Sequence, residues 1–318
     1  MPDLANGGPA VLRAPILPQG QYGFLNDLRR VADGTPAGVG TLARKAGLRG
    51  ILAKYNDGPA TVARDGSDIT WQANFRALAG PCRQAGLMLM PWGYVYPPDR
   101  TAVGELVAEA LADSGQATYI LDAEIEFDQA PNGAADAQAL IAAVRQAAPG
   151  VRLGYTSWGW PDQHPAFPWR AFQEGCDFFL PQVYPALLRV GPDYAWLRAY
   201  GGHDLAGGAN PGNGPQGFAS LAPTKPVVPI LDLSAIATEA HLVRKWAGPA
   251  IAWWVLDGIT TGKAGELGGT PYAGLAPGPV PPKPTSLPSH QPGDVTWQER
   301  ALTAEAKIAA ALRILQGE

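Results

Sequence analysis

The sequence predicts an α/β protein that folds as a (β/α)8 TIM barrel, followed by a proline-rich linker and a C-terminal amphipathic helix. Short apolar runs alternate with single helix-like segments, and this order is typical of a parallel sheet. About eight such units over about 250 residues indicate closure into a barrel. The 318 residues are 46% hydrophobic and 16% charged, which is enough apolar material for one large core.

Each expected strand is an apolar run that ends in polar or aromatic residues and a Pro or Gly break. Seven runs have this form, and they are 50–58, 87–97, 119–128, 151–160, 176–185, 226–234 and 250–258. An eighth strand is expected within 10–25. An open doubly wound sheet is the alternative fold, but it normally carries a phosphate-binding glycine turn after its first strand. The Gly212-x-Gly214-x-x-Gly217 match lies in a long loop with no strand before it, so no cofactor site is predicted.

A change of composition near residue 276 marks the end of the expected barrel domain, which spans 1–275. Residues 276–293 are proline-rich and predict an extended linker. Apolar residues at alternating spacings of four and three, from Trp297 to Leu315, predict a helix over 294–318. This helix either folds back on the barrel or serves in docking or self-association, because about 20 residues alone are marginal as a helix.

Charge and hydropathy exclude several partner classes. The formal net charge is -4 with acidic and basic residues intermixed, so no basic stripe for nucleic acid is expected. Neither a secretory signal nor an apolar run of about 18 residues is seen, so no membrane span is predicted, and the localisation stays open. Cys82 and Cys176 are far apart in sequence and are expected to be buried free thiols.

The stretch YILDAEIEFD (119–128) carries the strongest chemical signal. Asp122, Glu124 and Glu126 alternate with apolar residues, so on a barrel strand all three would face inward near the C-terminal mouth. Carboxylates this close repel each other, so at least one should keep its proton near neutral pH. One protonated and one ionised carboxyl is the pairing that glycoside hydrolysis requires. The alternatives are a solvent-facing polar strand, a bonded structural cluster, or a metal site, which the unclustered histidines do not favour.

Aromatic and polar residues gather at the ends of the other expected strands. A set of rings at several strand ends is typical of a carbohydrate cleft, where flat faces stack on sugars and polar tips reach hydroxyls. Gln182 could also bond a substrate acetamido group, and Asp257 either caps a helix or contacts the site, as does Asp232. The full set of expected substrate-binding residues is Tyr55, Trp92, Tyr94, Tyr155, Trp158, Gln182, Tyr184, Trp253, Trp254 and Asp257.

These residues resemble the glycoside hydrolase family 25 lysozymes, which are barrel enzymes that cleave peptidoglycan. KAGLRGILAKYNDG is similar to the family's second-strand region, LGYTSWGW to its fifth strand, and ILDAE to the Asp-x-Glu of its fourth strand. The resemblance implies that Glu124 is the general acid and Asp122 its carboxylate partner. One departure is that VLRAPILPQGQYGF lacks the family's first-strand Asp, and Asp27 lies beyond the expected position.

The same stretch more weakly resembles the family 18 chitinases, whose fourth strand ends in Asp-x-Asp-x-Glu. That resemblance implies that Glu126 is the acid and that the substrate's own acetamido group is the nucleophile. Tyr184 would then bond the acetamido group, and Trp253 or Trp254 would form the floor of the sugar site. Both resemblances imply a polysaccharide of β-1,4-linked N-acetylated sugars.

The sequence therefore predicts a glycoside hydrolase that acts on peptidoglycan, without a metal or cofactor. A chitinase-like hydrolase is the first alternative. The second is a non-catalytic glycan-binding or structural barrel, docked through 294–318 to a larger particle such as a phage tail.

Overall fold

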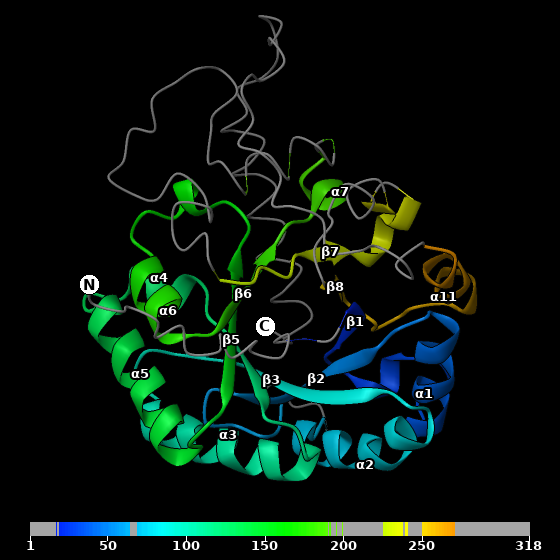
Figure 1. The fold of residues 1–318 in the computed structure, drawn as a ribbon, viewed down its shortest axis with the longest axis horizontal. Coiled ribbons are helices and arrows are strands. Elements are labelled where there is room, and N and C mark those ends of the chain that lie inside the picture. Colours follow the sequence, from blue (N-terminus) through cyan, green and yellow to red (C-terminus); the bar gives the residue numbers. More distant parts are fainter. Residues whose placement is uncertain are drawn as a thin grey trace, which may run out of the picture.

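The computed structural model describes residues 17, 19–63, 69–189, 191, 195, 199, 225–237, 239–240 and 250–270. Eight parallel strands follow one another around a closed barrel in chain order (Figure 1). The predicted (β/α)8 fold is therefore confirmed. The expected linker and the C-terminal helix lie outside the described residues.

The strands are short and buried along most of their length, as expected for a parallel sheet that is covered on both faces. Each predicted run contains one strand, and the eighth lies within 10–25 as expected. Their bounds are β1 Gly20–Leu25, β2 Gly50–Asp57, β3 Met88–Tyr94, β4 Thr118–Asp122, β5 Arg152–Trp158, β6 Phe178–Gln182, β7 Ile230–Asp232 and β8 Ala250–Trp254.

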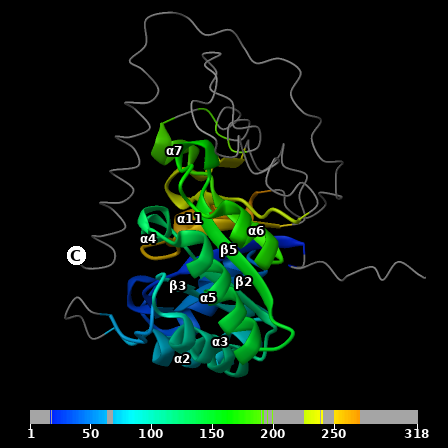
Figure 2. The ribbon, with the colours of Figure 1, turned by 90° about the vertical axis from the view of Figure 1, so that its left-hand side faces the viewer.

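Helices form the outer layer, and chain neighbours pack side by side around the barrel (Figures 1 and 2). Among them, α1 lies between α2 and α11, and α5 lies between α3 and α6. The longer helices are α1 Pro36–Lys45, α2 Trp71–Gln84, α3 Arg100–Ser114, α5 Gly133–Ala147, α6 Trp169–Gly175 and α11 Thr261–Gly268. The short ones are α4 Ile125–Gln129, α7 Pro185–Leu188, and the 3-10 turns η1 Leu28–Arg30, η2 Pro161–Gln163 and η3 Leu233–Ala235. No helix in the described part of the chain is long and apolar enough to cross a membrane.

The prediction of one strand over 119–128 is wrong after Asp122. The strand β4 ends there, Glu124 has φ -133° and ψ -135°, and α4 begins at Ile125. The helix turns the Phe127 ring into the α6 layer, where it meets Phe172 edge-on at 5.2 Å between centroids. Because α4 buries this ring completely, tertiary packing overrides the alternating pattern at this point.

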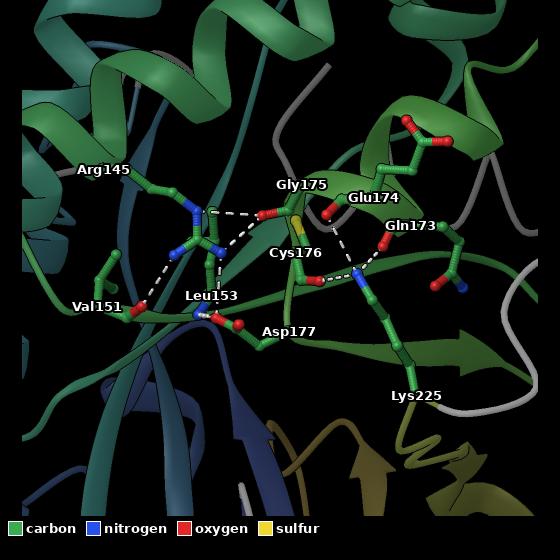
Figure 3. A network of polar contacts seen from close by, with 9 residues as sticks. All are labelled: Arg145, Val151, Leu153, Gln173, Glu174, Gly175, Cys176, Asp177 and Lys225. Carbon is green, nitrogen blue, oxygen red and sulfur yellow. Dashed lines mark hydrogen bonds and ion pairs between the residues drawn. The ribbon is translucent and has the colours of Figure 1, made fainter. Parts of the chain in front are cut away.

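A polar network ties α5 to the β5 and β6 strands (Figure 3). The Arg145 guanidinium donates to the Gly175 carbonyl at 2.6 Å and to the Val151 carbonyl at 3.3 Å. It also pairs with Asp177 at 3.2 Å, and the same Asp177 oxygen accepts the Leu153 N–H at 2.8 Å. The guanidinium fork thus bonds the end of one helix and the starts of two strands.

Lys225 anchors the chain ahead of β7 on the C-terminal end of α6 (Figure 3). Its ammonium donates to the carbonyls of Gln173, Glu174 and Cys176. A cation is favoured there because the last carbonyls of a helix carry partial negative charge. Cys82 and Cys176 are buried free thiols, as the sequence predicts.

Candidate active site

The register of the strands determines which side chains meet at the C-terminal mouth. Tyr94 of β3 lies beside Asp122 of β4, and Asp122 lies beside Thr156 of β5. Trp158 lies beside Gln182 on the next pair of strands. Because alternate strand residues share a face, these residues line the interior wall together.

Asp122 and Glu124 form the centre of this site. Their side chains are buried, at 5% and 7% exposure, and their carboxyls hydrogen-bond to each other. Burial and then the negative charge of Glu124 raise the pKa of Asp122 well above its usual range, although Lys54 opposes this rise. Burial also raises the pKa of Glu124, and the hydrogen bond from Gln182 Nε2 at 2.7 Å pulls it down. The pair can therefore share one proton, which is held in the hydrogen bond between the two carboxyls.

Glu126 lies near this pair but on a different element. Its Oε2 accepts the Tyr94 hydroxyl at 2.6 Å, and its side chain is half-buried on α4. Burial and then the nearby charges of Glu124, Glu126 and Asp122 raise the pKa of Tyr94, so this hydroxyl stays a donor. The structure thus brings the three predicted carboxylates together, although they do not share one strand face.

Tyr184, the N-cap residue of α7, also lies close enough to the pair to feel its charge. It is buried, and burial followed by the charges of Glu124 and Asp122 raises the pKa of its hydroxyl. Like Tyr94, it therefore keeps its proton over the working range of an enzyme. Asp122 Oδ1 is buried and has no hydrogen-bond partner among the described residues, so it can accept a bond from a substrate.

Aromatic rings gather at the mouth on two sides. Trp254 meets Trp92 at 5.8 Å and Phe24 at 5.5 Å between centroids, and Trp254 is only partly buried. Trp158 is also partly exposed, and its ring stacks on His164 at 3.6 Å. The peptide bond between Trp254 and Val255 is cis. Both exposed rings have the flat shape that carbohydrate binding uses.

Three aromatic residues expected at the site point their side chains outward from the strands, toward the helix layer, instead. The Tyr55 hydroxyl donates to Asp113 of α3 at 2.7 Å, and Trp253 Nε1 donates to Gln21 at 3.0 Å. Tyr155 is fully buried, and its ring stacks on Phe179 at 4.5 Å between centroids and on Phe172 of α6. They are placed there because each is an immediate sequence neighbour of an inward-facing residue, and adjacent strand residues point to opposite faces.

Asp257 also lies outside the group that surrounds the carboxylates. Its two oxygens accept the backbone N–H groups of Asn26 and Asp27, each at 2.9 Å. Burial raises the pKa of Asp257 to about 6, although the two N–H donors pull it down. Both of its oxygens hold the loop after β1, so the structure assigns Asp257 a structural role rather than substrate contact.

The end of β1 carries an aromatic ring rather than an acid. The sequence has no Asp near the end of β1, and there the ring of Phe24 packs against Trp92 and Trp254. Asp27 instead caps the η1 turn and pairs with Arg29 at 3.1 Å. On β7, Asp232 lies in register with Trp254, so the structure places a carboxylate on the same strand face as that ring.

The sequence analysis missed two buried ionisable residues near the site. Lys54 of β2 is 3% exposed, bonds Asp57 at 2.7 Å, and lies 4.2 Å above the Trp71 ring. Glu239 is fully buried, and burial raises its pKa to about 9. A lysine inside an apolar run was a usable signal for the first, whereas nothing in the sequence around Glu239 marks it.

Within the described residues, no group of three or more His, Cys, Asp and Glu side chains is arranged to hold a metal ion.

The sequence matches no protein-family model and no curated protein. Solved structures share the fold. A class V chitinase of Pseudomonas fluorescens superposes with a TM-score of 0.50 at 13% identity, over 78% of this chain and 98% of that chain. A GH18 chitinase of Cycas revoluta gives 0.48 at 9% identity, over 78% and 98% of the two chains. The spore cortex-lytic enzyme SleL of Bacillus cereus gives 0.48 at 11%, over 78% and 73%. At 13% identity the likeness to the Pseudomonas fluorescens chitinase shows a shared barrel fold alone.

Proposed function

We propose that this protein is a glycoside hydrolase that cleaves β-1,4 bonds in a glycan of N-acetylated sugars, with Glu124 as the general acid. The observation that carries the proposal is the buried pair of Asp122 and Glu124, which shares a proton at the barrel mouth. Active sites of such barrels lie at this end, and a carboxyl with a raised pKa is the acid that glycoside hydrolysis requires.

Glu124 suits this role better than Glu126 for a geometric reason. Gln182 and Asp122 hold the Glu124 carboxyl from two sides, so it is fixed in position. The Glu126 carboxyl is bonded by Tyr94 and lies half-exposed on α4. A positioned acid is effective because its proton must reach the leaving oxygen within hydrogen-bond distance.

The nucleophile is then the acetamido oxygen of the substrate. Phe24 lies near the end of β1, where the family 25 resemblance implies a second acid, and this favours a nucleophile supplied by the substrate. In the first step, the acetamido oxygen bonds to the anomeric carbon while the glycosidic C–O bond breaks and Glu124 protonates the departing oxygen. Water then attacks the anomeric carbon, and the bond between this carbon and the acetamido oxygen breaks. Glu124 takes a proton from the attacking water and is ready for the next turnover.

Asp122 and Tyr184 would orient that acetamido group. The Asp122 Oδ1 atom would accept the acetamido N–H, and the Tyr184 hydroxyl would donate to its oxygen. The sugar ring would stack on Trp254, which lies at the mouth where Trp253 does not. Both peptidoglycan and chitin carry this 2-acetamido chemistry, and peptidoglycan is the substrate proposed first.

The test is the release of reducing ends from purified peptidoglycan and from chitin. We expect Glu124→Gln to lose about 100- to 10,000-fold in kcat, the range that general acid catalysis contributes. Glu126→Gln should stay within about tenfold of the wild type. Glu174→Gln, on the outer end of α6, is the matched control and should be unchanged.

Two results would contradict the proposal. If Glu126→Gln loses activity while Glu124→Gln keeps it, the general acid is Glu126 on α4. No release from either polymer, with binding retained, would instead favour a non-catalytic glycan-binding barrel, the function to which the missing acid near Phe24 points.

A further inference from the structure

His164 lies in the loop between β5 and α6, and the mechanism above does not use it. Its backbone is fixed at both ends: its N–H donates to the Pro161 carbonyl at 3.2 Å, and its carbonyl accepts Trp169 Nε1 at 2.8 Å. Its side chain is about nine-tenths buried. The imidazole is therefore an ordered group at a defined position.

The imidazole is held between two partners. One is the Trp158 ring, which is parallel to it within 2° at 3.6 Å between centroids. The other is the Asp128 carboxylate, whose Oδ2 lies 3.6 Å from His164 Nδ1. A flat stack on one face and an acidic oxygen at the edge together fix the orientation of the ring.

Both partners lead back to Glu124. Asp128 is on α4, one helical turn after Glu124, and its N–H donates to the Glu124 carbonyl at 3.4 Å. Trp158 lies in register with Gln182, whose amide donates to Glu124 Oε1 at 2.7 Å. His164 is thus connected to Glu124 by two routes: through the backbone bond of Asp128 to the Glu124 carbonyl, and through Trp158, whose strand neighbour Gln182 bonds the Glu124 carboxyl.

Resting on the proposed role of Glu124, we propose that His164 is a positioning residue that fixes the Glu124 carboxyl through Asp128 on one side and Trp158 on the other. The charge of the imidazole also acts on the acid, because a positive His164 lowers the pKa of Glu124. The charged groups that act on it are Asp128, at 3.6 Å from its Nδ1, and Glu124.

The first experiment measures the pH profile of kcat/KM for His164→Phe and Asp128→Asn. Phenylalanine keeps a flat ring over Trp158 but removes both nitrogens. Without the positive charge the pKa of Glu124 rises, so we expect the alkaline limb to move to higher pH in His164→Phe but not in Asp128→Asn, which removes a negative charge instead. We expect kcat to fall about tenfold from the loss of orientation, with KM within about twofold. Glu174→Gln removes a remote negative charge and should leave the profile unchanged.

The second experiment does not need activity. The imidazole C–H signal of His164, assigned by its loss in His164→Phe, is titrated by NMR in the wild type, Glu124→Gln and Asp128→Asn. Coupling is reciprocal, so loss of either negative charge should lower the midpoint of the His164 titration. The control Glu174→Gln should not change it.

The outcomes separate this inference from the proposed function. A shifted midpoint in both variants of a protein that cleaves no glycan would support the coupling and reject the hydrolase. Normal hydrolysis with an unshifted pH profile in His164→Phe would overturn the inference and leave the hydrolase in place. A midpoint that responds to Asp128→Asn but not to Glu124→Gln would also overturn it.

Discussion

Glu239 is a buried acid whose proton should make the stability of the barrel depend on pH between pH 4.5 and about 9. It is fully buried, and its carboxyl accepts the Ala186 N–H of α7 at 3.4 Å. Burial, and the nearby charge of Asp232, raise its pKa from 4.5 to about 9. The folded protein therefore holds this proton at pH 7, whereas the unfolded chain releases it.

The sign and size of the effect follow from proton linkage. Between pH 4.5 and about 9, the folded state binds one proton more at this residue than the unfolded state does. The free energy of unfolding thus falls as pH rises, by about 1.36 kcal/mol per pH unit. Glu239→Gln removes this slope but keeps an oxygen for the Ala186 N–H. The unfolding free energy of the variant minus that of the wild type should therefore rise by about 4 kcal/mol from pH 5 to pH 8.

Urea unfolding at pH 5 and pH 8 measures this gain directly. The comparison with the wild type cancels the contributions of Asp257 and Asp122, whose pKa values are also raised. The exposed Glu174→Gln should show no pH-dependent difference. An equal difference in unfolding free energy at the two pH values would refute the reasoning, because it would mean that Glu239 titrates alike in both states.

Three further predictions test the placement of single side chains. Trp254→Ala should weaken binding of an N-acetylglucosamine oligomer to the inactive Glu124→Gln protein about tenfold by calorimetry, because it removes the exposed ring at the mouth; unchanged affinity would place the sugar elsewhere. Tyr155→Leu should destabilise the fold by about 2–4 kcal/mol in urea yet leave KM unchanged, since its ring packs on Phe179; a raised KM would return Tyr155 to the cleft. Lys225→Met should cost about 1–3 kcal/mol, because it leaves the α6 carbonyls without their donor; unchanged stability would show that the bonds in Figure 3 contribute nothing net.

Much of the candidate site was predictable because the positions are local to strand ends. Asp122, Glu124, Gln182 and Tyr184 were expected together, and the structure brings them together. In a parallel barrel every strand delivers its last residues to the same end, so strand-end chemistry can be read from a single chain. His164 was missed because it lies in a loop, where no periodicity indicates a direction.

Sequence alone determined the barrel and the strand whose end carries the acids, because alternation of strand and helix is a local pattern that admits few closures. Tertiary structure decided the rest. Trp253 and Trp254 are equivalent in sequence, and only the register with β1 and β7 shows that Trp254 faces the mouth. Glu124 and Glu126 also alternate equivalently, and the burial of Phe127 against α6 ended the strand between Asp122 and α4. A two-residue period shows which residues share a strand face. Contacts with residues distant in sequence decide whether that face points into the barrel or toward the helices.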